Sequence, residues 1–162
     1  MHRKRNRIEN FDYSQPNIYL ITICTENREH LFGVVTVHSD VPCTVLSPLG
    51  KLVKRSIEGI ETHYPNAILE AFSILPNHLH LLLRLDPTDV ANPPSVSRII
   101  KQMKEYVTKN CGRNVWQKGF HDEVIRTEEQ YLNAWNYVTY NPAKWETDEY
   151  YTPLSAYDPM HS

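Results

Sequence analysis

The chain has 162 residues, 41% hydrophobic and 22% charged, which are the proportions of an ordinary globular domain. Its net charge of −2 argues against a histone-like or architectural DNA-binding protein, since such proteins need a strongly basic surface. No run of residues approaches the ~18 apolar positions of a membrane helix, and the basic segment Met1–Arg7 lacks the apolar stretch of a secretory signal. Three widely spaced cysteines without a CxxC pair predict reduced thiols and a cytoplasmic location.

Local sequence signals predict alternating strands and helices. Ser47 and Thr127 are expected to cap helices, with Pro48 at a first helical position, and Pro142 is expected to end the last helix. In chain order we predict a strand at 17–24, a hairpin at 34–37 and 43–46, a helix from 48 to about 60, strands at 67–74 and 78–85, a helix at 96–109, a strand region at 115–116 and 120–125, and a helix from 128 to about 140.

Without the hairpin and the last helix, this order is βαββαβ. The predicted fold class is therefore α+β, a ferredoxin-like split βαβ with an antiparallel sheet and helices on one face. The hairpin and a tyrosine-bearing C-terminal helix are additions to that scaffold. The scaffold hosts RNA binders, small enzymes and nucleases, so the fold alone does not decide the function.

His78 and His80 open the predicted strand at 78–85. Residues i and i+2 of a strand point to the same face, so the two imidazoles are expected to lie side by side and could chelate a divalent cation. An isolated His-x-His more often faces water or makes ordinary hydrogen bonds. Here the pair follows a Pro76-Asn77 turn and leads into an apolar run, which places it at the mouth of a buried strand. Two histidines are too few for a closed metal site, so further ligands must come from elsewhere.

The last predicted helix supplies a candidate nucleophile, Tyr137, together with Asn141. The two residues are four positions apart, so they are expected to lie on the same edge of the helix. The pair could bring a phenol and an amide oxygen together over the sheet. Among ten tyrosines, most of which are expected to be packing residues, Tyr140 is the nearest rival. It lies ~100° from Asn141 around the helix, against ~40° for Tyr137.

Basic side chains form three clusters that are candidate phosphate contacts, although a single exposed cation more often faces only solvent. The predicted DNA contacts are Arg3, Lys4, Arg5 and Arg7 in the N-terminal arm, Lys101 and Lys104 in the helix at 96–109, and Arg126 before the last helix.

Motifs along almost the whole chain resemble the REP-associated tyrosine transposases, within the wider group of single-tyrosine His-hydrophobic-His (HUH) transposases. Pro-Asn-His-Leu-His at 76–80 and Tyr-x-x-x-Asn-Pro at 137–142 are together specific, whereas either motif alone would be weak. Further landmarks are Phe11-Asp12-Tyr13, the segment 19–28, Val115-Trp116-Gln117, Phe120-His121-Asp122 and Ile125-Arg126.

The resemblance implies a metal-dependent nuclease domain at residues 1–145 that cleaves and rejoins single-stranded or hairpin DNA through a phosphotyrosine. It places the nucleophile on Tyr137 and the metal ligands on His78, His80 and Asn141, with Mg or Mn as the ion. Insertion-sequence relatives more often carry Gln at the last position. The resemblance leaves open whether the protein is a monomer or a homodimer, and whether the tail 146–162 packs over the active site or floats.

Three other readings compete with this one. A domesticated relative would bind single-stranded nucleic acid without cutting, and an intact Tyr137 and histidine pair speak against it only moderately. A non-enzymatic nucleic-acid module of the same fold would read bases with exposed aromatic residues on two adjacent central strands, and the strand at 78–85 has none. A two-histidine phosphodiesterase would need two His-x-Ser/Thr motifs, and no second copy appears.

Overall fold

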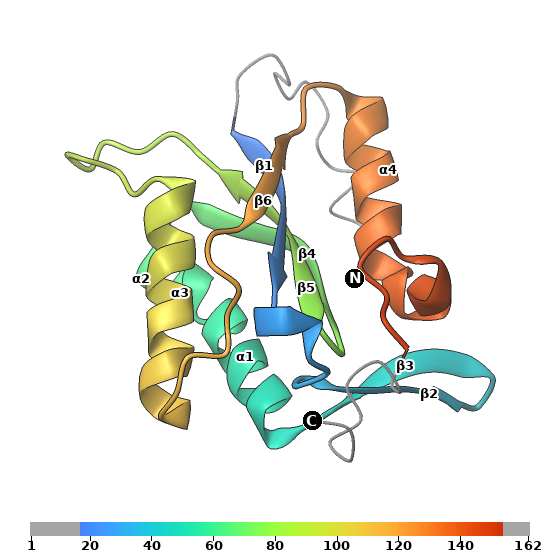
Figure 1. Ribbon diagram of the computed structural model, residues 1–162. Helices are drawn as coiled ribbons and strands as arrows, with labels where there is room; N and C mark the ends of the chain where they lie inside the picture. The colour runs from blue at the N-terminus through green and yellow to red at the C-terminus, as the bar shows by residue number, and fades with distance from the viewer. Residues whose placement is uncertain (1–16, 154–162) are drawn as a thin grey trace.

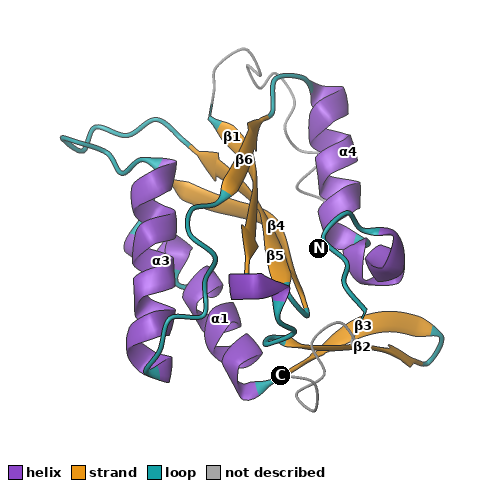
Figure 2. Ribbon diagram, in the orientation of Figure 1, coloured by secondary structure: helices purple, strands orange, loops and turns teal. Residues whose placement is uncertain are grey.

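The computed structural model describes residues 17–153, which form an antiparallel sheet with helices on both faces and a separate hairpin (Figures 1 and 2). The strands are β1 (Ile18–Cys24), β2 (Gly33–His38), β3 (Val41–Leu46), β4 (Ala67–Leu75), β5 (His78–Leu85) and β6 (His121–Val124). The α-helices are α1 (Pro48–Glu58), α2 (Ile60–His63), α3 (Val96–Cys111) and α4 (Glu128–Thr139), and the 3-10 helices are η2 (Glu26–Arg28) and η3 (Asn141–Thr147).

The main sheet has the order β4-β5-β1-β6, and all its neighbouring strands are antiparallel. Without the β2–β3 hairpin and α4, this is the predicted βαββαβ arrangement, and the ferredoxin-like fold class is confirmed. β5 lies between β4 and β1, which explains its nearly continuous apolar sequence. β6 pairs only with β1 among the described strands, so it forms one edge of the sheet.

Strand alternation divides the sheet into two apolar faces. Leu79, Leu81 and Leu83 of β5 join the larger core beneath α1 and α3. Leu82 points the other way, into a smaller core that Tyr131 and Trp135 of α4 complete. The first core therefore stabilises the scaffold, while the second anchors α4 over the face to which His78 and His80 belong.

Side-chain caps fix the helix ends near the predicted positions. The hydroxyl groups of Ser47, Ser95 and Thr127 accept hydrogen bonds from backbone N–H groups at the starts of α1, α3 and α4. Gly112 ends α3 at φ 84°, a left-handed conformation that glycine adopts without the cost of a Cβ clash.

The sequence prediction was less accurate where pairing or a proline overrides the local pattern. The expected strand segment at 115–116 makes only one isolated bridge, between Trp116 and Thr25. The chain after α4 continues as η3, which begins at Asn141-Pro142. Among residues 17–153, no helix is long and apolar enough to cross a membrane.

Candidate active site

The two histidines lie on the central strand β5, opposite Cys24 and Thr22 of β1 and Leu75 and Ser73 of β4. Both side chains are fully buried on the face that α4 covers, with ring centroids 4.7 Å apart. The strand geometry therefore brings the two imidazoles together as the i, i+2 spacing predicts.

Neighbouring side chains set which imidazole nitrogen faces the site. The Nδ1 atom of His78 lies 2.7 Å from the Oδ1 of Asn77, and the Nδ1 of His80 lies 3.0 Å from the Thr22 hydroxyl. The Asn77 amide donates through Nδ2 to the Tyr150 carbonyl and the Thr152 hydroxyl, so its Oδ1 must accept from His78. In His78, a proton on Nδ1 leaves the Nε2 lone pair available, which is the arrangement typical of a metal-binding histidine.

Asp148, which follows η3, brings a carboxylate to these two nitrogens. Its Oδ2 atom lies 3.5 Å from His78 Nε2 and 3.6 Å from His80 Nε2, and all three side chains have no exposed surface. These separations are long for hydrogen bonds. Two neighbouring ligands about 2.1 Å from one octahedral cation would lie roughly 3.0 Å apart, so the Asp148 oxygen and each imidazole nitrogen are close to the spacing of ligands of a common ion. They lie within 4.8 Å of one another.

Asn141 also reaches this carboxylate. It is buried at the start of η3, and its Nδ2 donates to Asp148 Oδ2 over 2.8 Å. Its Oδ1 is buried without a hydrogen-bond partner, as are the Nε2 atoms of His78 and His80. Buried acceptors without donors are costly, and a cation would satisfy them, so the residues present fit a divalent metal. A 180° rotation of the carboxamide would turn Oδ1 toward the same position.

Tyr137 joins the group from α4, whereas Tyr140 does not. The Tyr137 hydroxyl donates to Asp148 Oδ2 over 3.3 Å, and its ring centroid lies 4.8 Å from that of His80. Tyr140 is 50% exposed and packs its ring against Trp135. The side chains of one chain thus bring Tyr137, His78, His80 and Asn141 around a single carboxylate oxygen.

Burial and charge set the protonation states in this group. Burial raises the pKa of Tyr137 well above its ordinary value, and the nearby Asp148 carboxylate raises it further. Burial would also raise the pKa of Asp148, but its interactions with the two imidazoles and with the Tyr150 N–H outweigh burial and hold this pKa well below its usual range. The site therefore contains a protonated phenol beside an ionised carboxylate.

The segment after η3 covers the site. The ring centroid of Tyr150 lies 5.1 Å from that of His78. The guanidinium carbon of Arg28 lies over the Tyr150 ring, 4.9 Å from its centroid. His30 bonds to the Thr152 hydroxyl over 2.9 Å, and Trp145 packs beside His78 with ring centroids 5.9 Å apart. Residues 148–152 of the expected tail thus pack over the histidine pair.

Several known proteins are similar to this chain in sequence or in fold. An uncharacterized protein of Haemophilus influenzae is 31% identical over 93% of both chains, and the chain belongs to one family with it. A second H. influenzae protein, named "Putative REP-associated tyrosine transposase", is 29% identical over 82% of this chain and 74% of its own length. A REP-associated tyrosine transposase solved with a REP hairpin superimposes with a TM-score of 0.61 at 22% identity, over 80% of this chain and 68% of that one. The chain is related to the REP-associated tyrosine transposases. No protein-family model matches it.

The basic residues predicted as phosphate contacts lie on other elements than the histidine pair or outside the described residues. Arg3, Lys4, Arg5 and Arg7 lie outside residues 17–153. Lys101 is exposed on α3, on the other side of the sheet from His78. Lys104 is partly buried and donates to the carbonyls of Gln117 and Gly119. Arg126 is exposed in the link between β6 and α4.

Three residues of the site were missed from the sequence: Asp148, Asn77 and Thr22. Asn77 is part of the Pro-Asn-His-Leu-His motif of the transposase resemblance, so its position next to His78 was a usable signal. Thr22 could have been found only through the register of β1 against β5. Asp148 lies in an acidic stretch of the expected tail, and nothing in that stretch distinguishes it from Glu146 or Glu149.

Burial of His78 has a consequence for stability against pH. Burial lowers the pKa of His78 from 6.5 to about 4, so the folded protein resists protonation that the unfolded chain accepts. This contribution to stability is complete above pH 6.5 and is lost as the pH falls toward 4. We expect the metal-free protein to lose about 2 kcal/mol of unfolding free energy from this group between pH 7.5 and 5. Urea titrations of the wild type and His78→Ala should differ by that amount in their pH dependence, and equal pH dependence would contradict the assignment.

Asn77 is expected to act on the metal through His78. In Asn77→Ala the imidazole loses the acceptor that fixes its tautomer and orientation, and we expect Mn²⁺ affinity to fall about 10- to 100-fold. Isothermal titration with Mn²⁺ measures this directly. Asn110→Ala removes an exposed amide at the end of α3 and serves as the matched control. An unchanged Mn²⁺ affinity in a folded Asn77→Ala protein would show that the hydrogen bond from His78 Nδ1 to Asn77 does not contribute to metal binding.

Proposed function

We propose that the chain is a metal-dependent endonuclease that cleaves single-stranded DNA by attack of the Tyr137 oxygen on a phosphorus atom, and that it rejoins strands from the resulting phosphotyrosine. The observation that carries the proposal is the convergence of the Tyr137 hydroxyl, two imidazole Nε2 atoms and the Asn141 carboxamide on Asp148 Oδ2. The relationship to a transposase, and to one solved with a REP hairpin, supports single-stranded or hairpin DNA as the substrate.

The proposed metal ligands are His78, His80 and Asp148, with Asn141 as a fourth candidate through its amide oxygen. Mg or Mn, when bound there, would polarise a phosphate oxygen and so make the phosphorus more susceptible to attack. Imidazole ligands favour Mn somewhat, while carboxylate and phosphate oxygens suit both ions.

The protein's own groups position the nucleophile. The Tyr137 phenol is held by its bond to Asp148 and by the ring of His80. Attack forms a bond between the Tyr137 oxygen and phosphorus and breaks the bond from phosphorus to one DNA oxygen. That oxygen leaves as a hydroxyl group, which accounts for the proton lost by the phenol. Because the ester bond is retained on the tyrosine, the reverse attack by a DNA hydroxyl rejoins a strand without an external energy source.

One observation favours a second candidate, a non-cutting protein that binds single-stranded nucleic acid. The Asp148 carboxylate and the Tyr150 ring lie against His78, so a phosphate would reach the imidazole nitrogens only after the covering segment moves. A protein that keeps this segment closed would bind a strand elsewhere and leave it intact.

Covalent trapping distinguishes the two candidates. The full chain is incubated with Mn²⁺ and a labelled single-stranded hairpin DNA, with a chelator in a parallel reaction, and is then denatured. Nuclease activity predicts a labelled protein band that requires Mn²⁺, and peptide mass mapping should find the nucleotide on Tyr137. Binding of the same DNA without any adduct supports the non-cutting candidate. An adduct on another tyrosine, or strand cleavage without an adduct, contradicts the proposal.

A further inference from the structure

Three hollows lie next to one another between the active site and the outer face of α3. The first contains Tyr137 together with Thr22, His121 and Tyr150, and has a volume of about 390 Å³. The second, of about 200 Å³, shares Thr22, His121 and Tyr150 with the first and adds Arg28. The third, of about 750 Å³, shares Gln117, Lys118, Gly119 and Phe120 with the second. The shared lining residues place the three hollows in a row around the start of β6, and this row is called the path below.

The charged residues that line this path change from acidic in the hollow at Tyr137 to predominantly basic in the other two hollows. The hollow at Tyr137 contains the carboxylates of Glu123 and Glu149. The middle hollow contains Arg28 and Lys118. The third hollow is lined by four lysines and two glutamates (Lys101, Lys104, Lys109, Lys118, Glu26 and Glu105). The protein as a whole has a net charge of −2, so this excess of lysine is a local feature and not a general property of its surface.

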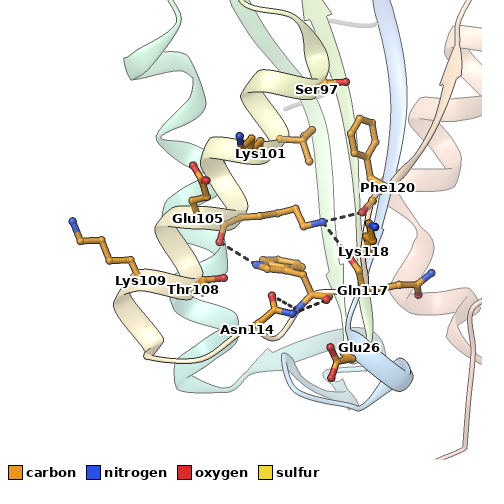
Figure 3. Close-up of a pocket in the computed structure, with 14 residues that line it drawn as sticks. Glu26, Ser97, Lys101, Glu105, Thr108, Lys109, Asn114, Gln117, Lys118 and Phe120 are labelled. Carbon is orange, nitrogen blue, oxygen red and sulfur yellow. Dashed lines mark hydrogen bonds between the residues drawn. The ribbon is translucent and has the colours of Figure 1, made fainter.

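Hydrogen bonds join the two sides of the third hollow. α3 forms one side and the segment 114–120 forms the other (Figure 3). The Lys104 ammonium donates to the carbonyls of Gln117 and Gly119, over 3.1 and 2.9 Å, and the Trp116 indole N–H donates to the Lys104 carbonyl. Lys104 is therefore a positioning residue that holds the two sides together. Lys101 and Lys118 are exposed and keep their ammonium groups available to a ligand.

An aromatic side chain lies along the path beside these cations. Phe120 is partly buried, packs against the core with one side and lines both the second and third hollows. Tyr150 lines the first and second hollows beneath Arg28. Cations that follow a groove, interleaved with aromatic rings, are the combination with which proteins bind a single strand without reading its sequence.

We propose that this path, formed by the three hollows, carries the nucleotides that flank the cleavage point, with their phosphates on Lys101 and Lys118 and a base against Phe120. The proposal rests on the proposed function in taking single-stranded DNA as the ligand. It adds a second contact region on the far side of β6 from Tyr137. The proposed ligand is a single strand and not a duplex, because base stacking on a wall residue requires unpaired bases.

Oligonucleotide length provides the test. Fluorescence anisotropy is measured with labelled oligo-dT from about 4 to about 16 nucleotides, in chelator so that no strand is cut. Wild-type affinity should rise with length as the strand extends into the third hollow. The double variant Lys101→Glu with Lys118→Glu should lose this gain, binding the longest strand at least about 10-fold more weakly, with a salt slope lower by about 1.4 for two lost phosphate contacts.

The matched control is Lys51→Glu with Lys54→Glu, which makes the same charge change at exposed positions of α1. The proposal predicts a smaller loss and no change in length dependence for this pair, and thermal melting should show both double variants folded. Equal losses in the two pairs, or wild-type affinity independent of length, would overturn the path. Oligo-U bound more tightly than oligo-dT through the same lysines would overturn DNA as its ligand.

The outcomes separate this inference from the proposed function. An adduct on Tyr137 with equal behaviour of the two lysine pairs would leave the nuclease proposal standing and remove the path. A length-dependent loss confined to Lys101 and Lys118, with no adduct in the wild type, would retain the path and remove the nuclease proposal.

Discussion

We expect Tyr137→Phe to abolish the covalent protein–DNA adduct, reducing its yield by at least about 10³-fold. The phenol oxygen is the atom that would be esterified, and phenylalanine removes it while keeping the ring that packs 4.8 Å from His80. The lost hydrogen bond to Asp148 is long, at 3.3 Å, so the variant should lose no more than about 1 kcal/mol of stability. Gel analysis of denatured reactions in Mn²⁺ measures the adduct, and chemical denaturation checks the fold.

Tyr140→Phe is the matched control for that change. Tyr140 lies three residues away, is half exposed and packs its ring on Trp135 rather than on the histidines. Adduct yield should be unchanged in this variant. A normal yield in Tyr137→Phe, or a loss in Tyr140→Phe alone, would mean that the nucleophile has been misassigned.

Local patterns were sufficient to predict the scaffold. The i, i+2 spacing of His78 and His80 survives in the structure because β5 is a regular central strand, in which alternation is strict. The four-residue spacing of Tyr137 and Asn141 was a weaker guide. α4 ends at Thr139 and Asn141 begins a 3-10 helix, yet both side chains still reach Asp148.

The remainder of the site depends on contacts between distant segments. Asp148 meets His78 across seventy positions of sequence, and no periodicity connects a residue after η3 with a strand in the middle of the chain. The orientation of Asn77 likewise depends on Tyr150 and Thr152, which belong to that same late segment. A segment that folds back onto a distant site has no local sequence pattern that predicts this contact. Its side chains can be assigned to the site only from the three-dimensional structure.

The second large effect is expected from the metal ligands. In His80→Ala one of the paired Nε2 atoms is lost, and we expect Mn²⁺ affinity to fall at least about 100-fold. Removing a residue that only hydrogen-bonds to a metal ligand lowers affinity about 10- to 100-fold, and the loss of the ligand itself should cost at least as much. The adduct should disappear with it. Isothermal titration with Mn²⁺ measures metal binding without requiring any reaction. Thermal melting of the metal-free protein tests whether the variant is folded.

His63→Ala is the control, since it removes an exposed histidine of α2 and should change neither Mn²⁺ affinity nor adduct yield.

A further experiment mixes the His80→Ala protein with the Tyr137→Phe protein. Because one chain brings Tyr137 to its own histidine pair, with ring centroids 4.8 Å apart, the mixture should form no adduct. Adduct formation in the mixture would mean that α4 serves a partner's site, and unchanged Mn²⁺ affinity in His80→Ala would exclude the histidine pair as the metal site.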